Sequence, residues 1–246
     1  KVCVGDQLHP RGRLDPVTYD LIRPVFASIR DKEPWCVGAR PVADIGIIAV
    51  NDGEYGHSMR PKIKTLEAAT QMLLEDHRLF QIIDREDDLS RYKLLICPDI
   101  LRFDENLAGK IEAYLRGGGR LILSWQSGLS TGDERFAIDV GAEAQGFSEF
   151  RASYLRFKKI LAEGIPEADY VVCERALNVL PKEAEVLAEL VHPYFDRTWA
   201  HFMSHAQTPP DKPGPYAGIL RYNNIIYFAH PLFRGYKKFG NFCYKK

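Results

Sequence analysis

The feature that most constrains this fold is an alternation, between residues 44 and 125, of short apolar runs with amphipathic segments. The runs are continuously apolar, which predicts strands buried on both faces. They are DIGIIAV (44–50), LFQIID (79–84), KLLICPD (93–99) and RLILSW (120–125). Between them, residues 61–76 and 105–119 repeat apolar residues every three or four positions, as helices do. Because strands and helices alternate, we predict a doubly wound, mostly parallel sheet.

The rest of the chain, from residue 136 onward, has a different character. Strand-like runs separated by Pro, Gly and Asn predict an antiparallel extension of the sheet; they are SYLRF, ADYVVCE, AEVLAELV and AGILRYNNIIYFAH. Asn223 and Asn224 tolerate positive φ, so we expect a hairpin there. The proline-rich segment 205–217 is expected to be a loop.

The first 41 residues form a separate part. Lys1–Val4 predicts the end of a buried strand. Apolar residues from Leu14 to Ile29 predict an amphipathic helix, with Asp15 as its N-cap and Pro16 at its first position. Residues 33–43, with two prolines and one glycine and no periodicity, predict a linker. We therefore divide the chain into residues 1–41 and 42–246.

Composition excludes several partners. Lysine plus arginine equals aspartate plus glutamate at 33 each, so no global field would attract nucleic acid or an anionic membrane. No apolar run approaches the ~18 residues that span a bilayer. Five scattered cysteines without a C-x-x-C pair predict free thiols, and hence a reducing, cytoplasmic setting.

The candidate substrate-binding residues are Asp6, Gln7 and His9, which follow the first strand. If that strand belongs to a β/α barrel, its carboxyl end faces the active site, and these side chains would bind substrate hydroxyls. The alternative is an ordinary turn in which Asp6 caps local amides and His9 is exposed. The sequence leaves both open.

Other motifs lack the pattern that their chemistry needs. In SWQSGLSTG (124–132), a nucleophile elbow would put Gln126 at the attacking position, and Ser127 is one residue out of register. The loop NDGEYGHSMRP (51–61) has no phosphate-binding glycine pattern. Asp52, Glu54 and His57 are expected in a solvated loop; the alternative is that they contact a ligand or a neighbouring subunit. The histidines lack metal-ligand spacing, and no carboxylate pair stands out. We predict no catalytic, cofactor or metal residues.

Several of these stretches resemble bacterial glycoside hydrolases, including proteins assigned as α-L-fucosidases, in which a β/α barrel precedes a β-galactosidase trimerisation domain. The resemblance rests on GDQLHPRGRLD, EPW and GARPVADIGII near the start, GGGRLILSWQSGL in the middle and IIYFAHPLFRGY near the end. It implies a flavodoxin-like, class I glutamine amidotransferase-like domain preceded by the remnant of a barrel.

This resemblance also implies a function. The chain would be a non-catalytic portion of the hydrolase that joins subunits into a homo-oligomer such as a trimer, and that completes the sugar pocket's rim with Asp6, Gln7 and His9. The catalytic carboxylates would lie on barrel strands that this sequence lacks. Two alternatives remain: a stand-alone amidotransferase-like or esterase-like enzyme that uses Ser127 or Cys97 with a later histidine, and a small-ligand binding module.

Overall fold

The computed structural model describes residues 9–49, 59–205 and 207–240, with side chains described from residue 64 in the second stretch. The strand predicted over residues 1–4 lies outside these ranges. The chain divides into two compact units, Lys1–Val42 and Ala43–Lys246. Each unit is described by itself below.

The first unit contains one long helix, α1 (Pro16–Cys36). The predicted cap is confirmed, because the Asp15 carboxylate accepts a hydrogen bond from the Val17 N–H and Pro16 occupies the first helical position. The linker prediction was wrong for residues 33–36, which complete the last helical turn. None of the residues of α1 is buried, so its apolar side chains contribute little packing within this unit.

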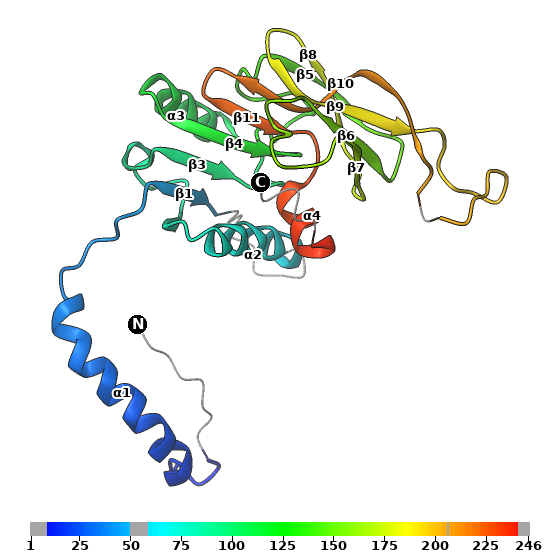
Figure 1. The fold of residues 1–246 in the computed structure, drawn as a ribbon. Helices are drawn as coiled ribbons and strands as arrows, with labels where there is room; N and C mark the ends of the chain where they lie inside the picture. The colour runs from blue at the N-terminus through cyan, green and yellow to red at the C-terminus, as the bar shows by residue number, and fades with distance from the viewer. Residues whose placement is uncertain (1–8, 50–58, 206, 241–246) are drawn as a thin grey trace. The chain divides into compact units, whose positions relative to one another are not determined.

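The parallel half of the second unit has the predicted order of strands and helices. Its elements are β1 (Ile45–Ile48), α2 (Met59–Glu75), β2 (Phe80–Ile83), η1 (Leu89–Arg91), β3 (Leu94–Cys97), α3 (Glu105–Arg116) and β4 (Arg120–Ser124). The β1 strand pairs in parallel with β2 and β3, and β3 pairs in parallel with β4. The alternation of apolar strands and helices therefore produced the fold that it predicted (Figure 1).

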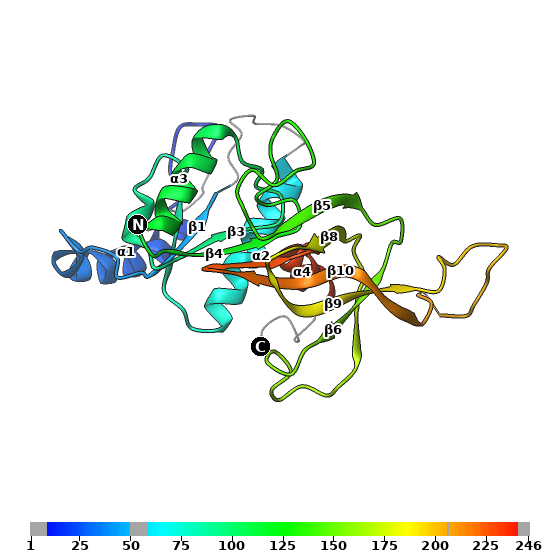
Figure 2. The same cartoon turned by 90° about the horizontal axis from the view of Figure 1, so that it is seen from above.

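Successive residues of these strands pack on opposite faces of the sheet. Ile47 and Ile96 join a cluster with Leu232 and Phe233, on the face that α2 covers. Ile48 and the alternate residues of β3 and β4 face the other way and join a second cluster with the apolar side of α3. Figures 1 and 2 show the sheet between these two helical layers. Burial on both faces explains why β1 and β3 contain no polar side chain.

The antiparallel extension is also confirmed. It consists of β6 (Ser153–Phe157), β7 (Asp169–Val172), β9 (Glu185–Pro193), β10 (Pro210–Tyr222) and β11 (Ile225–Phe228). The nine strands follow the order β2-β1-β3-β4-β11-β10-β9-β6-β7. β11 pairs in parallel with β4 and antiparallel with β10, so it joins the two halves. The predicted hairpin turns at Asn223, which has a φ of 49°.

Four elements of this unit were not predicted, the first of which is the short helix η1 given above. The strands β5 (Ala142–Phe147) and β8 (Leu177–Pro181) pair as a small antiparallel sheet, and Leu177 and Val179 pack with the α3 cluster. The helix α4 (Leu232–Phe239) lies beside α2 and ends at Gly240, whose φ is 63°. None of the described helices has the length and apolar character needed to cross a membrane.

The prediction that residues 205–217 form a loop was wrong from Pro210 onward. This stretch is the first half of β10, and it pairs with β9 through Pro210–Pro193 and Pro213–Val191 with shifts of register. β11 pairs only with residues 219–222 of β10. Proline is tolerated here because a strand with one hydrogen-bonded neighbour does not need every N–H group.

Candidate functional site

The predicted substrate-binding residues lie at the edge of what the structure describes. Asp6 and Gln7 fall outside it, as do Asp52, Glu54 and His57 of the second candidate loop. His9 is exposed and belongs to a turn, where its Nδ1 accepts a hydrogen bond from the Arg11 N–H at 3.2 Å and its carbonyl accepts one from the Gly12 N–H at 2.7 Å.

The turn after β4, where a nucleophile elbow would lie, places its strained residue at Trp125. Trp125 follows the strand directly and has a φ of 53°, in the left-handed region that bulky residues avoid. Such a turn exposes a serine or cysteine in enzymes with this motif. Here the position belongs to an indole, which cannot attack a carbonyl. The motif pointed to Gln126 and Ser127, because the strained φ of Trp125 cannot be read from sequence.

Neither alternative nucleophile is accessible. Ser127 and Cys97 are fully buried. The Ser127 hydroxyl has no hydrogen-bond partner within the described structure, so no described histidine activates it. Burial raises the pKa of the Cys97 thiol, which keeps it protonated and unreactive. The arrangement that a stand-alone hydrolase needs is not formed by these two residues.

The polar centre at this edge of the sheet is a buried carboxylate, Asp99, which follows β3. It is fully buried and has a φ of 38°. Its Oδ1 accepts hydrogen bonds from the Ser124 hydroxyl at 2.7 Å and the Phe233 N–H at 3.3 Å, and its Oδ2 accepts one from the Arg234 N–H at 2.8 Å. The Asp99 N–H in turn donates to Ser124 Oγ at 2.9 Å.

Asp99 acts as the N-cap of α4. The residue at the N-cap position is Pro231, whose side chain makes no capping hydrogen bond. The N–H groups of the first turn are instead satisfied by a carboxylate 134 residues earlier in the sequence. A negative charge there also interacts favourably with the helix dipole. The hydrogen bonds of Asp99 therefore hold α4 against the carboxyl ends of β3 and β4.

The side chain of Arg234 closes the same edge of the sheet. Its guanidinium carbon lies 4.8 Å from the centre of the Trp125 ring, and the Phe147 ring lies 5.7 Å from that ring on centroids. Arg234 also forms an ion pair with Glu174 at 2.9 Å, and Lys238 pairs with the other oxygen of Glu174 at 3.0 Å. Packed side chains therefore surround the elbow where an enzyme would leave space for substrate.

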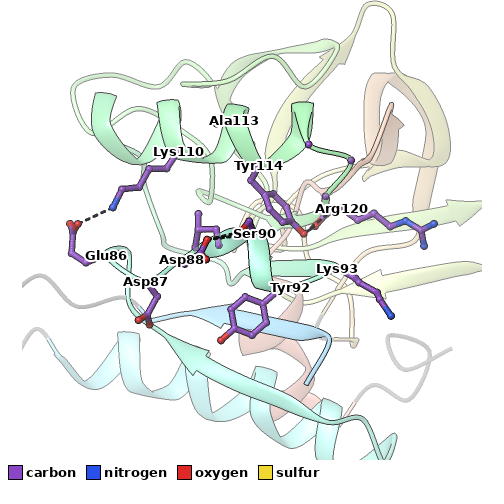
Figure 3. Close-up of a pocket in the computed structure, with 14 residues that line it drawn as sticks. Glu86, Asp87, Asp88, Ser90, Tyr92, Lys93, Lys110, Ala113, Tyr114 and Arg120 are labelled. Carbon is purple, nitrogen blue, oxygen red and sulfur yellow. Dashed lines mark hydrogen bonds and ion pairs between the residues drawn. The ribbon is translucent and has the colours of Figure 1, made fainter. Parts of the chain in front are cut away.

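The best-defined pocket lies at the opposite edge, near the amino ends of β3 and β4 (Figure 3). It has a volume of about 780 Å³. Two of its polar side chains interact with the pocket's own wall. Lys110 pairs with Glu86 at 2.8 Å, and the Tyr114 hydroxyl bonds to the backbone of Arg120. Open α/β sheets bind ligands at the carboxyl ends of their strands. We therefore attribute this pocket to the packing of α3 against η1.

Titratable clusters give no further site in the described part of the chain. It contains no group of three or more His, Cys, Asp or Glu side chains arranged to hold a metal ion. His230, at the end of β11, is buried, and burial lowers its pKa to about 3. A histidine with this pKa stays neutral near pH 7.

Comparison with known proteins gives a consistent family. Residues 71–208 match the family described as the β-galactosidase trimerisation domain. No curated protein sequence matches the chain. Among solved structures, α-L-fucosidase isoenzyme 2 from Paenibacillus thiaminolyticus is similar over 98% of this chain and 37% of its own, with 34% identity and a TM-score of 0.84.

Two further structures share the fold at lower identity. The cold-adapted β-galactosidase from Rahnella sp. R3 aligns with 93% of this chain and 35% of its own, at 15% identity and a TM-score of 0.63. A GH42 β-galactosidase from G. stearothermophilus aligns with 90% of this chain and 32% of its own, at 16% identity and a TM-score of 0.61. The chain thus spans about a third of the length of these three proteins.

We predict that replacing Asp99 destabilises the fold. Asp99→Ala leaves two N–H groups of α4 and the Ser124 hydroxyl without their acceptor, and should lower the free energy of unfolding by about 3 kcal/mol. Asp99→Asn keeps one acceptor oxygen and should cost about 1 to 2 kcal/mol. Urea denaturation measures both. Asp211→Ala, at an exposed aspartate, is the control; equal effects at both aspartates would contradict the capping role.

The pH dependence of stability should separate Asp99 from His230. Burial raises the pKa of Asp99 to about 6, although hydrogen bonds from Arg234, Ser124 and Phe233 oppose this. Because the folded-state pKa lies above the ordinary value of 3.8, the proton-linked part of the stability that Asp99 contributes is full below pH 3.8 and is lost as the pH rises through 6. The depressed pKa of His230 has the opposite effect: its stability is present above pH 6.5 and is lost toward pH 3.

We therefore expect opposite changes in the two variants when denaturation is repeated from pH 7 to pH 4. Asp99→Asn should lose stability relative to the wild type on acidification, and His230→Gln should gain it. Each change is at most about 1.4 kcal/mol per pH unit. Parallel curves for all three proteins would show that neither group titrates as the structure implies.

Proposed function

The chain belongs to the β-galactosidase trimerisation domain family, and from this premise we propose that it is a non-catalytic, subunit-joining portion of a glycoside hydrolase. The observation that carries the proposal is the family match over residues 71–208. The site geometry supports it, because Trp125 and its packed neighbours occupy the place of a nucleophile. The proposed assembly is a homotrimer.

For the parent protein we propose an α-L-fucosidase, with a β-galactosidase as the second candidate. The support is the similarity to the Paenibacillus fucosidase, which at 34% identity is higher than that to the two β-galactosidases. In this proposal the catalytic carboxylates lie on a β/α barrel outside the sequence studied. Asp6, Gln7 and His9 complete the rim of the sugar pocket, at the carboxyl end of a barrel strand.

The exposed apolar surface of α1 supports packing of this helix against a further structural element. Val17, Leu21 and Val25 recur every four residues and so lie in one row along the helix. Their exposed fractions are 70%, 75% and 54%, and Leu14 and Phe26 are also exposed. A helix stabilised in water normally buries such a row against another element. We propose that α1 packs against the catalytic barrel, as the helix that follows its last strand.

The proposed setting is reducing and cytoplasmic. Cys36, Cys97 and Cys173, the cysteines that the structure describes, are free thiols. Free thiols are usual in compartments that glutathione and thioredoxin keep reduced.

We predict that the 246-residue chain self-associates. Sedimentation velocity at rising concentration should show a species of about 84 kDa, three times the 28.0 kDa of one chain. A single 28.0 kDa species at every concentration would contradict the subunit-joining role. A stable dimer would contradict the trimer and leave self-association in place.

We also predict that a substitution on the apolar row of α1 lowers the protein's stability only when the proposed barrel is present. In the longer protein, expressed from the same gene, Leu21→Glu should lower the stability of the catalytic domain by about 3 kcal/mol, because it buries a charge. In the 246-residue chain the same change should stay within about 0.5 kcal/mol.

The control for this experiment is Lys32→Gln, which lowers the net charge by the same amount at an exposed position of α1. The longer protein should hydrolyse a nitrophenyl α-L-fucoside or β-D-galactoside, and the 246-residue chain should not. Hydrolysis by the chain alone would overturn the non-catalytic assignment.

A further inference from the structure

The connection between β9 and β10 forms a projecting arm. We define the arm as residues 194–209, excluding residue 206, which is not described. β9 and β10 remain paired out to Pro193 and Pro210, so they carry the arm on a two-stranded ribbon. Figures 1 and 2 both show this segment extending away from the strands and helices of its unit.

The base of the arm is anchored to the sheet. The Tyr154 hydroxyl on β6 donates to the Thr208 carbonyl at 2.5 Å, and the Thr208 hydroxyl donates to the Phe195 carbonyl at 2.5 Å. Tyr154 and Thr208 are both buried. These bonds fix the direction in which the arm leaves the sheet.

The tip of the arm has its own internal structure. The Arg197 guanidinium donates to the His205 carbonyl at 3.0 Å and lies 5.4 Å from the centre of the Phe202 ring. The Thr198 N–H donates to the His201 carbonyl at 3.0 Å, and the His201 N–H donates back to Thr198 Oγ1 at 3.1 Å. Contacts within the arm therefore organise the tip, which reduces the entropy that binding would cost.

This organised tip presents aromatic side chains to solvent. The exposed fractions of Trp199, Phe202 and Tyr194 are 101%, 70% and 64%, so Trp199 makes no packing contact that covers it. Each such side chain can bury about 150–250 Å². Trp, Tyr and Arg are also the residue types that dominate binding energy at protein interfaces. The arm thus has the composition of an interface anchor with a polar rim.

We propose that the arm docks on a second copy of this chain, with Trp199 as its central anchor; this rests on the proposed subunit-joining function. The family match ends at residue 208, so it includes nearly all of the arm. The equal numbers of acidic and basic residues mean that no net charge opposes self-association. A protruding arm fits a head-to-tail contact, in which each copy inserts its arm into the next, and three such contacts close a ring.

Tryptophan fluorescence of the 246-residue chain tests this proposal directly. The chain has three tryptophans, of which Trp199 lies on the arm, so subtracting the spectrum of Trp199→Phe from the wild-type spectrum isolates the Trp199 emission. We expect this emission to shift to shorter wavelength as the concentration rises and the oligomer forms. Sedimentation velocity on the same samples reports the assembly state independently.

Trp199→Ser should weaken assembly by about thirtyfold or more, as for a central interface anchor. Its monomer should unfold at the wild-type urea midpoint, because the Trp199 side chain is fully exposed and packs against no described part of its own chain. The control is Leu79→Ser, just before β2, where a side chain that is 69% exposed lies away from the arm. That variant should assemble like the wild type.

The outcomes separate this inference from the proposed function. If the wild type forms oligomers while Trp199 keeps the emission of an exposed indole and Trp199→Ser assembles normally, the arm proposal is overturned and self-association stands. If the wild type is monomeric at every concentration, both are overturned. If Leu79→Ser weakens assembly as much as Trp199→Ser, the effect is not specific to the arm and the proposal fails.

Discussion

The capping of α4 by Asp99 is the interaction on which the second unit depends. It joins the turn after β3 to a helix 134 residues later, and through Ser124 it reaches the end of β4 as well. With α4 held there, Leu232 and Phe233 complete the apolar cluster that covers one face of β1 and β3. β11, which immediately precedes α4, then lies between the parallel and antiparallel halves of the sheet. One buried carboxylate thus connects chain segments that no local pattern would bring together.

The same edge of the sheet holds no accessible serine or cysteine at the described turn after β4. The strained turn after β4 is retained, but it holds Trp125, and Arg234 lies over the indole. Strain of this kind costs about 1–3 kcal/mol and persists where the surroundings over-determine it. Here the surroundings are the ion pairs of Glu174 and the hydrogen bonds of Asp99. The turn contributes to packing, and the surfaces available for function lie elsewhere.

Those surfaces are two sets of exposed apolar side chains, one in each unit. In the first unit they form a row along α1, and in the second they lie on the tip of an arm that is organised by its own contacts. Monomeric proteins rarely expose contiguous apolar surface without an interaction that covers it. In the proposed assembly, α1 therefore contacts the catalytic domain of the same polypeptide, and the arm contacts another subunit.

The sequence by itself determined the order of strands and helices from residue 44 to residue 125, the cap of α1, the hairpin at Asn223 and the family resemblance. These follow from local periodicity, from turn chemistry and from short motifs, all of which depend on residues close together in the sequence. Only the tertiary structure decided that the prolines of 210–217 lie in a strand, because their tolerance depends on which side of β10 has a partner. It also decided the roles of Asp99, Trp125 and Trp199. Contacts between distant segments make the carboxylate a helix cap and place one indole in a left-handed turn and the other in water. Residue type and spacing do not encode these contacts.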